Sequence, residues 1–181
     1  VVLYNNLGNF NIQHFQKRKQ LVILVNNGIH PGEPDGIDAS MILLKNILNK
    51  QIKINDNIIL AIIPIYNIGG ALQRNSVTRV SQDGPLSYGF RGNAQNLDLN
   101  RDFIKCDSEN AKSFTKMYRA WDPDVFIDTH VSDGADYQYV MTLIPTQHNK
   151  LPLPLDNYLK KTMLPVLYTE MKKAGWPMCP Y

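Results

Sequence analysis

Two short polar segments carry side chains that could hold a metal ion. His30 to Glu33 (HPGE) places an imidazole and a carboxylate in one tight Pro-Gly turn, and Asp128 to His130 (DTH) ends in a second imidazole. Zinc accepts nitrogen and oxygen ligands, and a catalytic zinc site keeps three protein ligands and leaves one position for water. His30, Glu33 and His130 are therefore a chemically sufficient ligand set.

Neither segment is specific when it is taken singly. His-x-x-Glu occurs by chance, and a histidine at the end of a strand is more often hydrogen-bonded than bound to a metal. Asp128 adds a candidate carboxylate partner for His130, because residues two apart on a strand share a face, although a rotation into the loop would direct it elsewhere.

A third polar segment could bind a carboxylate. It runs from Asn96 to Phe103 (NLDLNRDF) and follows Arg91 in GFRGN. Arginine presents a planar fork that suits a carboxylate, and a neighbouring asparagine can donate to the same group. A solvated polar loop is the alternative, but here the polar side chains cluster in one long irregular stretch, from Tyr66 to Phe103.

Each of the two metal-ligand segments follows a short predicted strand, at residues 21–26 and 125–129. Leu21 to Asn26 and a further run, Asn57 to Ile65, are nearly continuous apolar runs, which suits strands buried on both faces. Two more strands are predicted for residues 1–4 and 137–144. Ligand sites in parallel sheets lie beyond the carboxyl ends of the strands, where both segments are placed.

Three helices are predicted between and after these strands. Ile37, Met41, Leu44 and Leu48 recur at three- and four-residue steps, which indicates a helix that turns this set toward a core. A second helix is capped by residue 107 or 108 and ends near residue 121. The last runs from about residue 156 to 174, with Pro165 kinking or dividing it.

The alternation of strands and helices predicts an α/β fold, with a parallel or mixed sheet and helices on both faces. At 181 residues the chain is long enough for one core, so we expect a single domain over residues 1–181. The composition, 44% hydrophobic and 19% charged, is that of a globular enzyme. The net charge of +3 is scattered, which argues against a nucleic-acid partner, and no apolar run is long enough for a membrane helix.

Together the three polar segments resemble the M14 zinc carboxypeptidases, over about residues 21–144. HPGEP resembles the family's first ligand motif, DTHVSDGADY its third-ligand region and NLDLNRDF its substrate-carboxylate motif. The resemblance implies that His30, Glu33 and His130 hold one Zn²⁺ and that Asn100 and Arg101 bind the free C-terminal carboxylate of a peptide. It implies that Arg91 polarises the scissile carbonyl, and it slightly favours a secreted or periplasmic protein, although the chain starts with no signal segment.

The sequence departs from this family in its general base, a glutamate that the family takes from a late strand. The chain has only Glu33, Glu109 and Glu170, and the last two lie in predicted helices without a matching motif. We expect a chain trimmed at both ends rather than an inactive relative, because the other motifs are intact. Such a chain would expose a sheet edge and associate into homo-oligomers.

Two other functions compete with the peptidase. N-acyl amino acid deacylases of the aspartoacylase and succinylglutamate desuccinylase type share a His-x-x-Glu and an Asn-Arg pair, but they typically have Gly-Asn where this chain has Pro31 and Gly32. A non-catalytic module that binds zinc or peptides is the third hypothesis.

Overall fold

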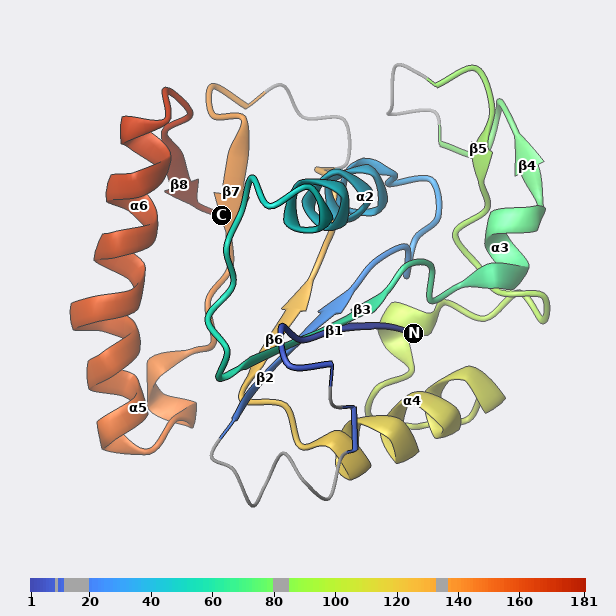
Figure 1. The fold of residues 1–181 in the computed structure, drawn as a ribbon. Coiled ribbons are helices and arrows are strands. Elements are labelled where there is room, and N and C mark those ends of the chain that lie inside the picture. Colours follow the sequence, from blue (N-terminus) through green and yellow to red (C-terminus); the bar gives the residue numbers. More distant parts are fainter. Residues whose placement is uncertain (9, 12–19, 80–84, 133–136) are drawn as a thin grey trace. The chain divides into compact units, whose positions relative to one another are not determined.

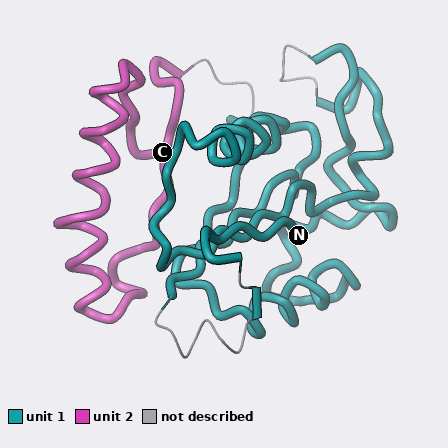
Figure 2. The backbone as a smooth tube through the Cα atoms, viewed as in Figure 1, with its two compact units in different colours: residues 1–134 teal, residues 135–181 magenta. Residues whose placement is uncertain are grey.

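The computed structural model describes residues 1–8, 10–11, 20–79, 85–132 and 137–181. The chain divides into two compact units, Val1–Gly134 and Ala135–Tyr181, which Figure 2 colours teal and magenta. The single domain expected from the sequence stays a prediction, because compact units within a chain are not by themselves separate domains.

The first unit is built on a four-stranded sheet with the strand order β1-β3-β2-β6 (Figure 1). Its strands are β1 (Val2–Tyr4), β2 (Leu21–Asn26), β3 (Ile58–Ile63) and β6 (Val125–Asp128). β2 pairs parallel with both β3 and β6, whereas β1 pairs antiparallel with β3. The sheet is therefore mixed, and the carboxyl ends of β2, β3 and β6 lie at one edge.

Helix α2 (Asp35–Leu48) packs on one face of this sheet (Figure 1). Its Ile47 is buried in a cluster with residues of β2 and β3, and Leu44 packs against the same cluster. The predicted helix is confirmed, but the predicted inward face was partly wrong, since Met41 and Leu48 are 59% and 70% exposed. The stripe that reaches the sheet is narrower than the apolar pattern suggests.

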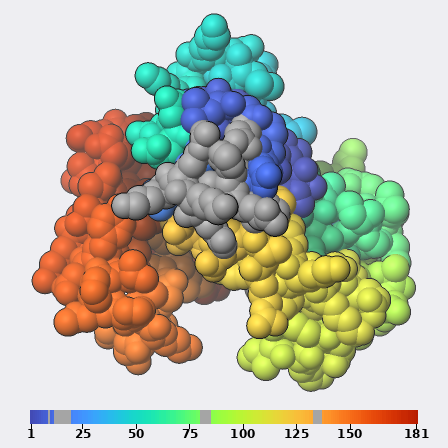
Figure 3. All heavy atoms as spheres, turned by 60° about the horizontal axis from the view of Figure 1, so that its bottom comes forward, coloured from blue at the N-terminus to red at the C-terminus, as the bar shows by residue number. Residues whose placement is uncertain are grey.

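Helix α4 (Glu109–Trp121) packs on the opposite face. Its Phe114 lies in a cluster with Leu24 of β2 and Ala61 of β3, and the outer side of the helix is at the surface in Figure 3. Of the two predicted caps, Ser108 is the N-cap, and its side chain accepts a hydrogen bond from the backbone N–H of Ala111. The unit thus has helices on both faces of a mixed sheet, and the protein is of the α/β class.

The segment between β3 and α4 was predicted to be irregular, and its described part contains only short elements. These are α3 (Ile68–Leu72), β4 (Arg74–Asn75), β5 (Tyr88–Gly89) and the 3₁₀ helix η1 (Leu99–Arg101). β4 and β5 pair antiparallel in a small sheet of their own.

The second unit pairs β7 (Met141–Leu143) parallel with β8 (Met178–Pro180). It also contains η2 (His148–Lys150), α5 (Leu153–Tyr158), a π-helical turn (Leu159–Met163) and α6 (Leu164–Lys173). The strand predicted for residues 137–144 was too long, because β7 pairs only over the three residues that β8 offers.

The last predicted helix was wrong in where it begins. It begins at Leu153 rather than near residue 156, because Pro154 fits a first turn, where its missing N–H has no helical partner to lose. Pro165 lies in the first turn of α6, directly after the π-helical turn of residues 159–163 that separates α5 from α6, so the regular α-helix is divided next to Pro165 as the sequence predicted. None of the helices in the described ranges is long and apolar enough to cross a membrane.

Candidate metal centre

The loop that carries His30 is fixed at the carboxyl end of β2. Gly28 adopts a φ of +63°, a left-handed conformation that glycine adopts without strain, and its carbonyl oxygen accepts the N–H of Asn67. The fully buried Asn67 side chain donates to the carbonyl oxygens of Ile29 and Arg91 at 3.3 and 3.0 Å. One amide therefore ties the loop before His30 to the loop of Arg91.

His130 is positioned from the neighbouring strand. Asn26 at the end of β2 is in register with Asp128 at the end of β6, and the Asn26 Nδ2 donates to Asp128 Oδ1 at 2.8 Å. Thr129 donates its hydroxyl to the Oδ1 of Asn27, also at 2.8 Å. Because the two parallel strands end side by side, these bonds bring the His130 loop against the His30 loop.

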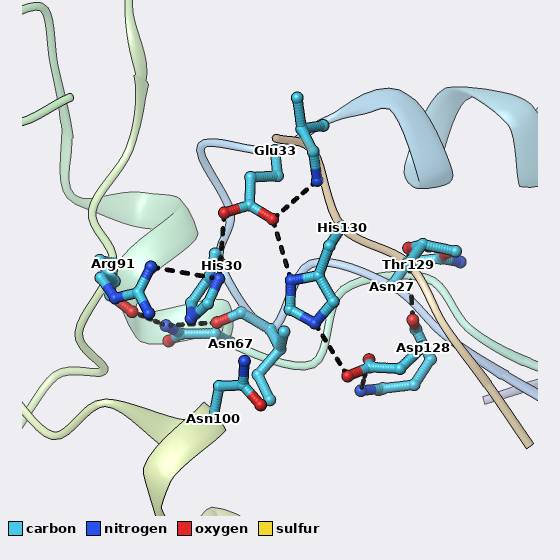
Figure 4. Close-up of polar contacts among 12 residues, drawn as sticks. Asn27, His30, Glu33, Asn67, Arg91, Asn100, Asp128, Thr129 and His130 are labelled. Atoms are coloured by element: carbon cyan, nitrogen blue, oxygen red, sulfur yellow. Dashed lines mark hydrogen bonds and ion pairs between the residues drawn. The ribbon is translucent and has the colours of Figure 1, made fainter. Parts of the chain in front are cut away.

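Glu33 lies between the two imidazoles (Figure 4). Its Oε1 is 3.0 Å from Nδ1 of His30, and its Oε2 is 3.0 Å from Nδ1 of His130. The ring centroids of the two histidines are 5.1 Å apart. The structure thus brings together the three side chains that the sequence singled out, from segments 97 residues apart.

Each imidazole turns its other nitrogen to a carboxylate. Nε2 of His30 is 3.4 Å from Oδ1 of Asp98, and Nε2 of His130 is 3.0 Å from Oδ2 of Asp128. A carboxylate that accepts the Nε2–H bond leaves the Nδ1 lone pair available, and metal-bound histidines commonly have such a partner. Asp128 therefore takes the position beside His130 that the sequence suggested.

The ionisation of the group follows from these contacts. Burial on its own would raise the pKa of Glu33, but hydrogen bonds from His130, His30 and the backbone N–H of Val131 hold it well below its usual range. Hydrogen bonds with Asp128 and then Glu33 raise the pKa of His130 to about 9. Glu33 is thus an anion in the ion-free protein, and His130 is a cation at neutral pH.

The donor set fits a divalent metal ion. One ligand atom from each of His30, Glu33 and His130 lies within 4.8 Å of the others. Tetrahedral zinc with bonds of about 2.0 to 2.1 Å separates its ligand atoms by roughly 3.3 Å, close to the spacings between Glu33 and the imidazoles. His30 and Glu33 are each only 3% exposed, whereas His130 is 33% exposed, so the group opens to solvent on one side.

Comparison of the chain with protein-family models, with curated proteins and with solved structures gave no match. The geometry of the site therefore carries the functional argument.

The three residues expected to bind substrate are placed differently from one another. Arg91 donates from Nε to Oδ2 of Asp98 at 2.8 Å, and its guanidinium lies 3.4 Å from Nδ1 of His30. Asn100 is half-buried and lies beneath the two imidazoles in Figure 4. Arg101 is exposed and donates to the carbonyl oxygen of Asn100 at 3.0 Å, and no contact within the described ranges joins it to the metal-ligand group.

Within the described part of the first unit, no glutamate contacts the metal-ligand group besides Glu33 itself. Glu109 is exposed on α4, where its Oε1 accepts from Lys112 at 2.7 Å. Glu170 lies in the second unit and pairs with Lys173.

Two contributing residues were missed in the sequence. Asp98 lies inside the NLDLNRDF motif, and its carboxylate contacts His30, Arg91 and the backbone N–H of Asn100. Its place two residues before Asn100 was the available signal. Arg79, whose NH2 is 2.9 Å from Oε1 of Glu33, gave no signal, because nothing in its local pattern points to a residue 46 positions away.

Proposed function

We propose that this chain is a zinc-dependent hydrolase of the metallocarboxypeptidase type, which removes the C-terminal residue of peptides. The observation that carries the proposal is the convergence of two Nδ1 atoms on one buried carboxylate, with a further carboxylate behind each imidazole. Zinc supplies two kinds of chemistry when it is bound, since it acidifies water and polarises carbonyl oxygens.

The residues around the group have separate tasks. His30, Glu33 and His130 hold the ion, while Asp98 and Asp128 orient the two imidazoles. Arg91, fixed by Asp98 beside His30, presents positive charge to a carbonyl oxygen that becomes an anion.

We assign the binding of the substrate's terminal carboxylate to Asn100 and Arg101. Asn100, which lies beneath the two imidazoles in Figure 4, would donate its amide N–H, and the neighbouring exposed Arg101 would add a positive charge. We assign no residue of this chain as the general base, because Glu33 is a ligand and Glu109 pairs with Lys112.

Metal analysis tests the centre directly. The chain, purified without chelator and analysed by mass spectrometry, is expected to hold one zinc ion, and His30→Ala is expected to lose it, since removing one of three ligands weakens binding by roughly a hundredfold or more. His148→Ala is the matched control, because His148 is exposed in the second unit. Equal zinc in all three proteins, or zinc in none, would refute the proposed centre.

Ligand binding then separates the candidate functions. The zinc-loaded chain is expected to bind a peptide with a free C-terminus more tightly than its amidated form, and Asn100→Ala is expected to narrow that difference. Preference for an N-acyl amino acid over the peptide would favour the deacylase. Peptide binding without cleavage by a longer natural chain would favour the non-catalytic module.

A further inference from the structure

A buried arginine contacts the metal-ligand carboxylate. Arg79 is 7% exposed, and its NH2 is 2.9 Å from Oε1 of Glu33, which is itself 3% exposed. The same oxygen faces Nδ1 of His30 at 3.0 Å. Arg79 is therefore not a solvated loop arginine, because its charge lies directly on a predicted metal ligand.

The loop is built to hold Arg79 in this position. The backbone N–H of Arg79 donates to the hydroxyl oxygen of the buried Tyr88 at 3.3 Å, and that hydroxyl lies 2.9 Å from the carbonyl oxygen of Ser76. Gly32 packs closely against the side chain of Arg79, since a Cβ at position 32 would come within 2.4 Å of the Arg79 Cδ. A side chain at that position of the HPGE turn would displace the guanidinium from Glu33.

The contact has opposite consequences with and without a bound cation. A buried carboxylate that lacks a partner is costly, so a positive group beside Glu33 stabilises the ion-free protein. Arginine keeps its charge at all accessible pH values and therefore also repels a divalent ion held by the same carboxylate. A single residue thus lowers the free energy of the ion-free state and raises that of the ion-bound state.

We propose that Arg79 is a positioning residue that supplies positive charge to Glu33 in the ion-free protein and thereby limits how tightly the centre binds its metal. The inference rests on the metal centre of the proposed function and extends it to a residue that binds neither metal nor substrate. It requires no particular substrate.

Zinc affinity and stability measured on the full chain test this role. Arg79→Met and Arg79→Gln remove the charge, whereas Arg79→Lys retains it. We expect the two neutral variants to bind Zn²⁺ roughly tenfold or more tightly than the wild type in competition with a chromogenic chelator, because a like charge beside the ion is gone. Arg79→Lys is expected to stay within about threefold of the wild type.

The rise in Tm on adding Zn²⁺ distinguishes the proposed role from a merely structural one. A structural arginine stabilises the ion-free and zinc-loaded proteins equally, whereas the proposed role predicts a loss of stability mainly in the ion-free protein. The rise in Tm on adding Zn²⁺ is therefore expected to be larger for the neutral variants than for the wild type. A neutral variant that folds only when zinc is added would support the inference in the same way.

Arg74→Met is the matched control, since it removes an exposed arginine from the same segment. It is expected to leave zinc affinity unchanged. Unchanged or weaker binding in both neutral variants, or unfolding of both with and without zinc, would overturn the inference while the centre itself stands. Absence of zinc binding by the wild type would overturn both.

Discussion

At the scale of single residues, the charge state of His130 couples proton and metal binding. Hydrogen bonds with Asp128 and Glu33 raise its pKa to about 9 in the ion-free protein, from an ordinary value of 6.5. A metal ion needs the neutral imidazole, so below about pH 9 His130 must release a proton before it can be a ligand. The two carboxylates that orient the ring thus also make the proton a competitor of the metal.

We therefore expect zinc affinity to rise with pH by about tenfold per unit below about pH 9 and to level off near pH 9. The folding stability of the ion-free protein should instead fall as the pH rises. A raised folded-state pKa contributes stability that is fully present below the unfolded value, 6.5, and is lost as the pH rises through about 9. Zinc titrations by calorimetry in buffers of different ionisation enthalpy would count the protons released.

Asp128→Asn serves as the comparison for this prediction. It removes the negative charge that contributes most to the raised pKa, so the plateau in zinc affinity should move to lower pH. Zinc binding without proton release at neutral pH would contradict the assignment of His130 as a ligand.

The same scale shows why some site residues could be predicted and others could not. His30, Glu33 and His130 could be singled out because their residue types are intrinsic metal ligands and each follows an apolar strand. The contacts of Arg79 and Asp98 with the centre depend on how the segment between β3 and α4 folds back, over separations of 46 and 68 residues. Patterns within a short stretch of sequence cannot predict such long-range contacts.

At the scale of elements, the start of α2 is pressed against the end of β6, and this contact positions His130. A Cβ added at Gly36 would come within 2.1 Å of Oγ1 of Thr129 and 2.8 Å of Oδ1 of Asn27. Those two atoms form the hydrogen bond that fixes the residue before His130. The absence of a side chain at position 36 thus allows the helix and the strand end to approach closely enough.

Gly36→Ala is expected to weaken zinc binding by about tenfold and to lower the free energy of unfolding by about 1 to 3 kcal/mol, as overpacking in a tight contact does. The gain in helix propensity, less than about 1 kcal/mol, is too small to offset this. Chelator competition and urea unfolding would measure the two effects.

Lys45→Ala in the same helix is the control, because Lys45 is exposed and distant along α2. Wild-type zinc affinity in Gly36→Ala would mean that the close contact does not position His130.

The elements themselves could be predicted where the apolar pattern is strong. β2 matches its predicted range because five consecutive apolar side chains followed by Asn26 indicate a buried strand, and α4 could be placed by its cap and stop signals. The inward face of α2 could not be predicted, since exposed Met41 and Leu48 fit the helical period as well as buried Ile47 does. Periodicity identifies a helix, but tertiary packing decides which of two overlapping stripes is buried.

At the scale of the whole molecule, every residue assigned to the centre lies in the first unit. The ligands follow β2 and β6, and Arg79, Arg91, Asp98 and Asn100 all come from the segment between β3 and α4. The sequence predicted one domain and gave no boundary near residue 134, because no linker-like composition separates the units. The two compact units become visible only in the folded chain.

This division leads to a prediction about the isolated first unit. Residues 1–134 include both faces of the mixed sheet, with α2 and α4 in place, and all three ligands. We expect this fragment to fold and to bind zinc within about threefold of the affinity of the full chain, because no assigned ligand or imidazole partner is removed. The comparison uses the same chelator competition for the two proteins, with His30→Ala in each as the baseline. If the fragment folds, as judged by its circular dichroism, but binds zinc a hundredfold more weakly, residues 135–181 must contribute to the centre and the assignment of its ligands is incomplete.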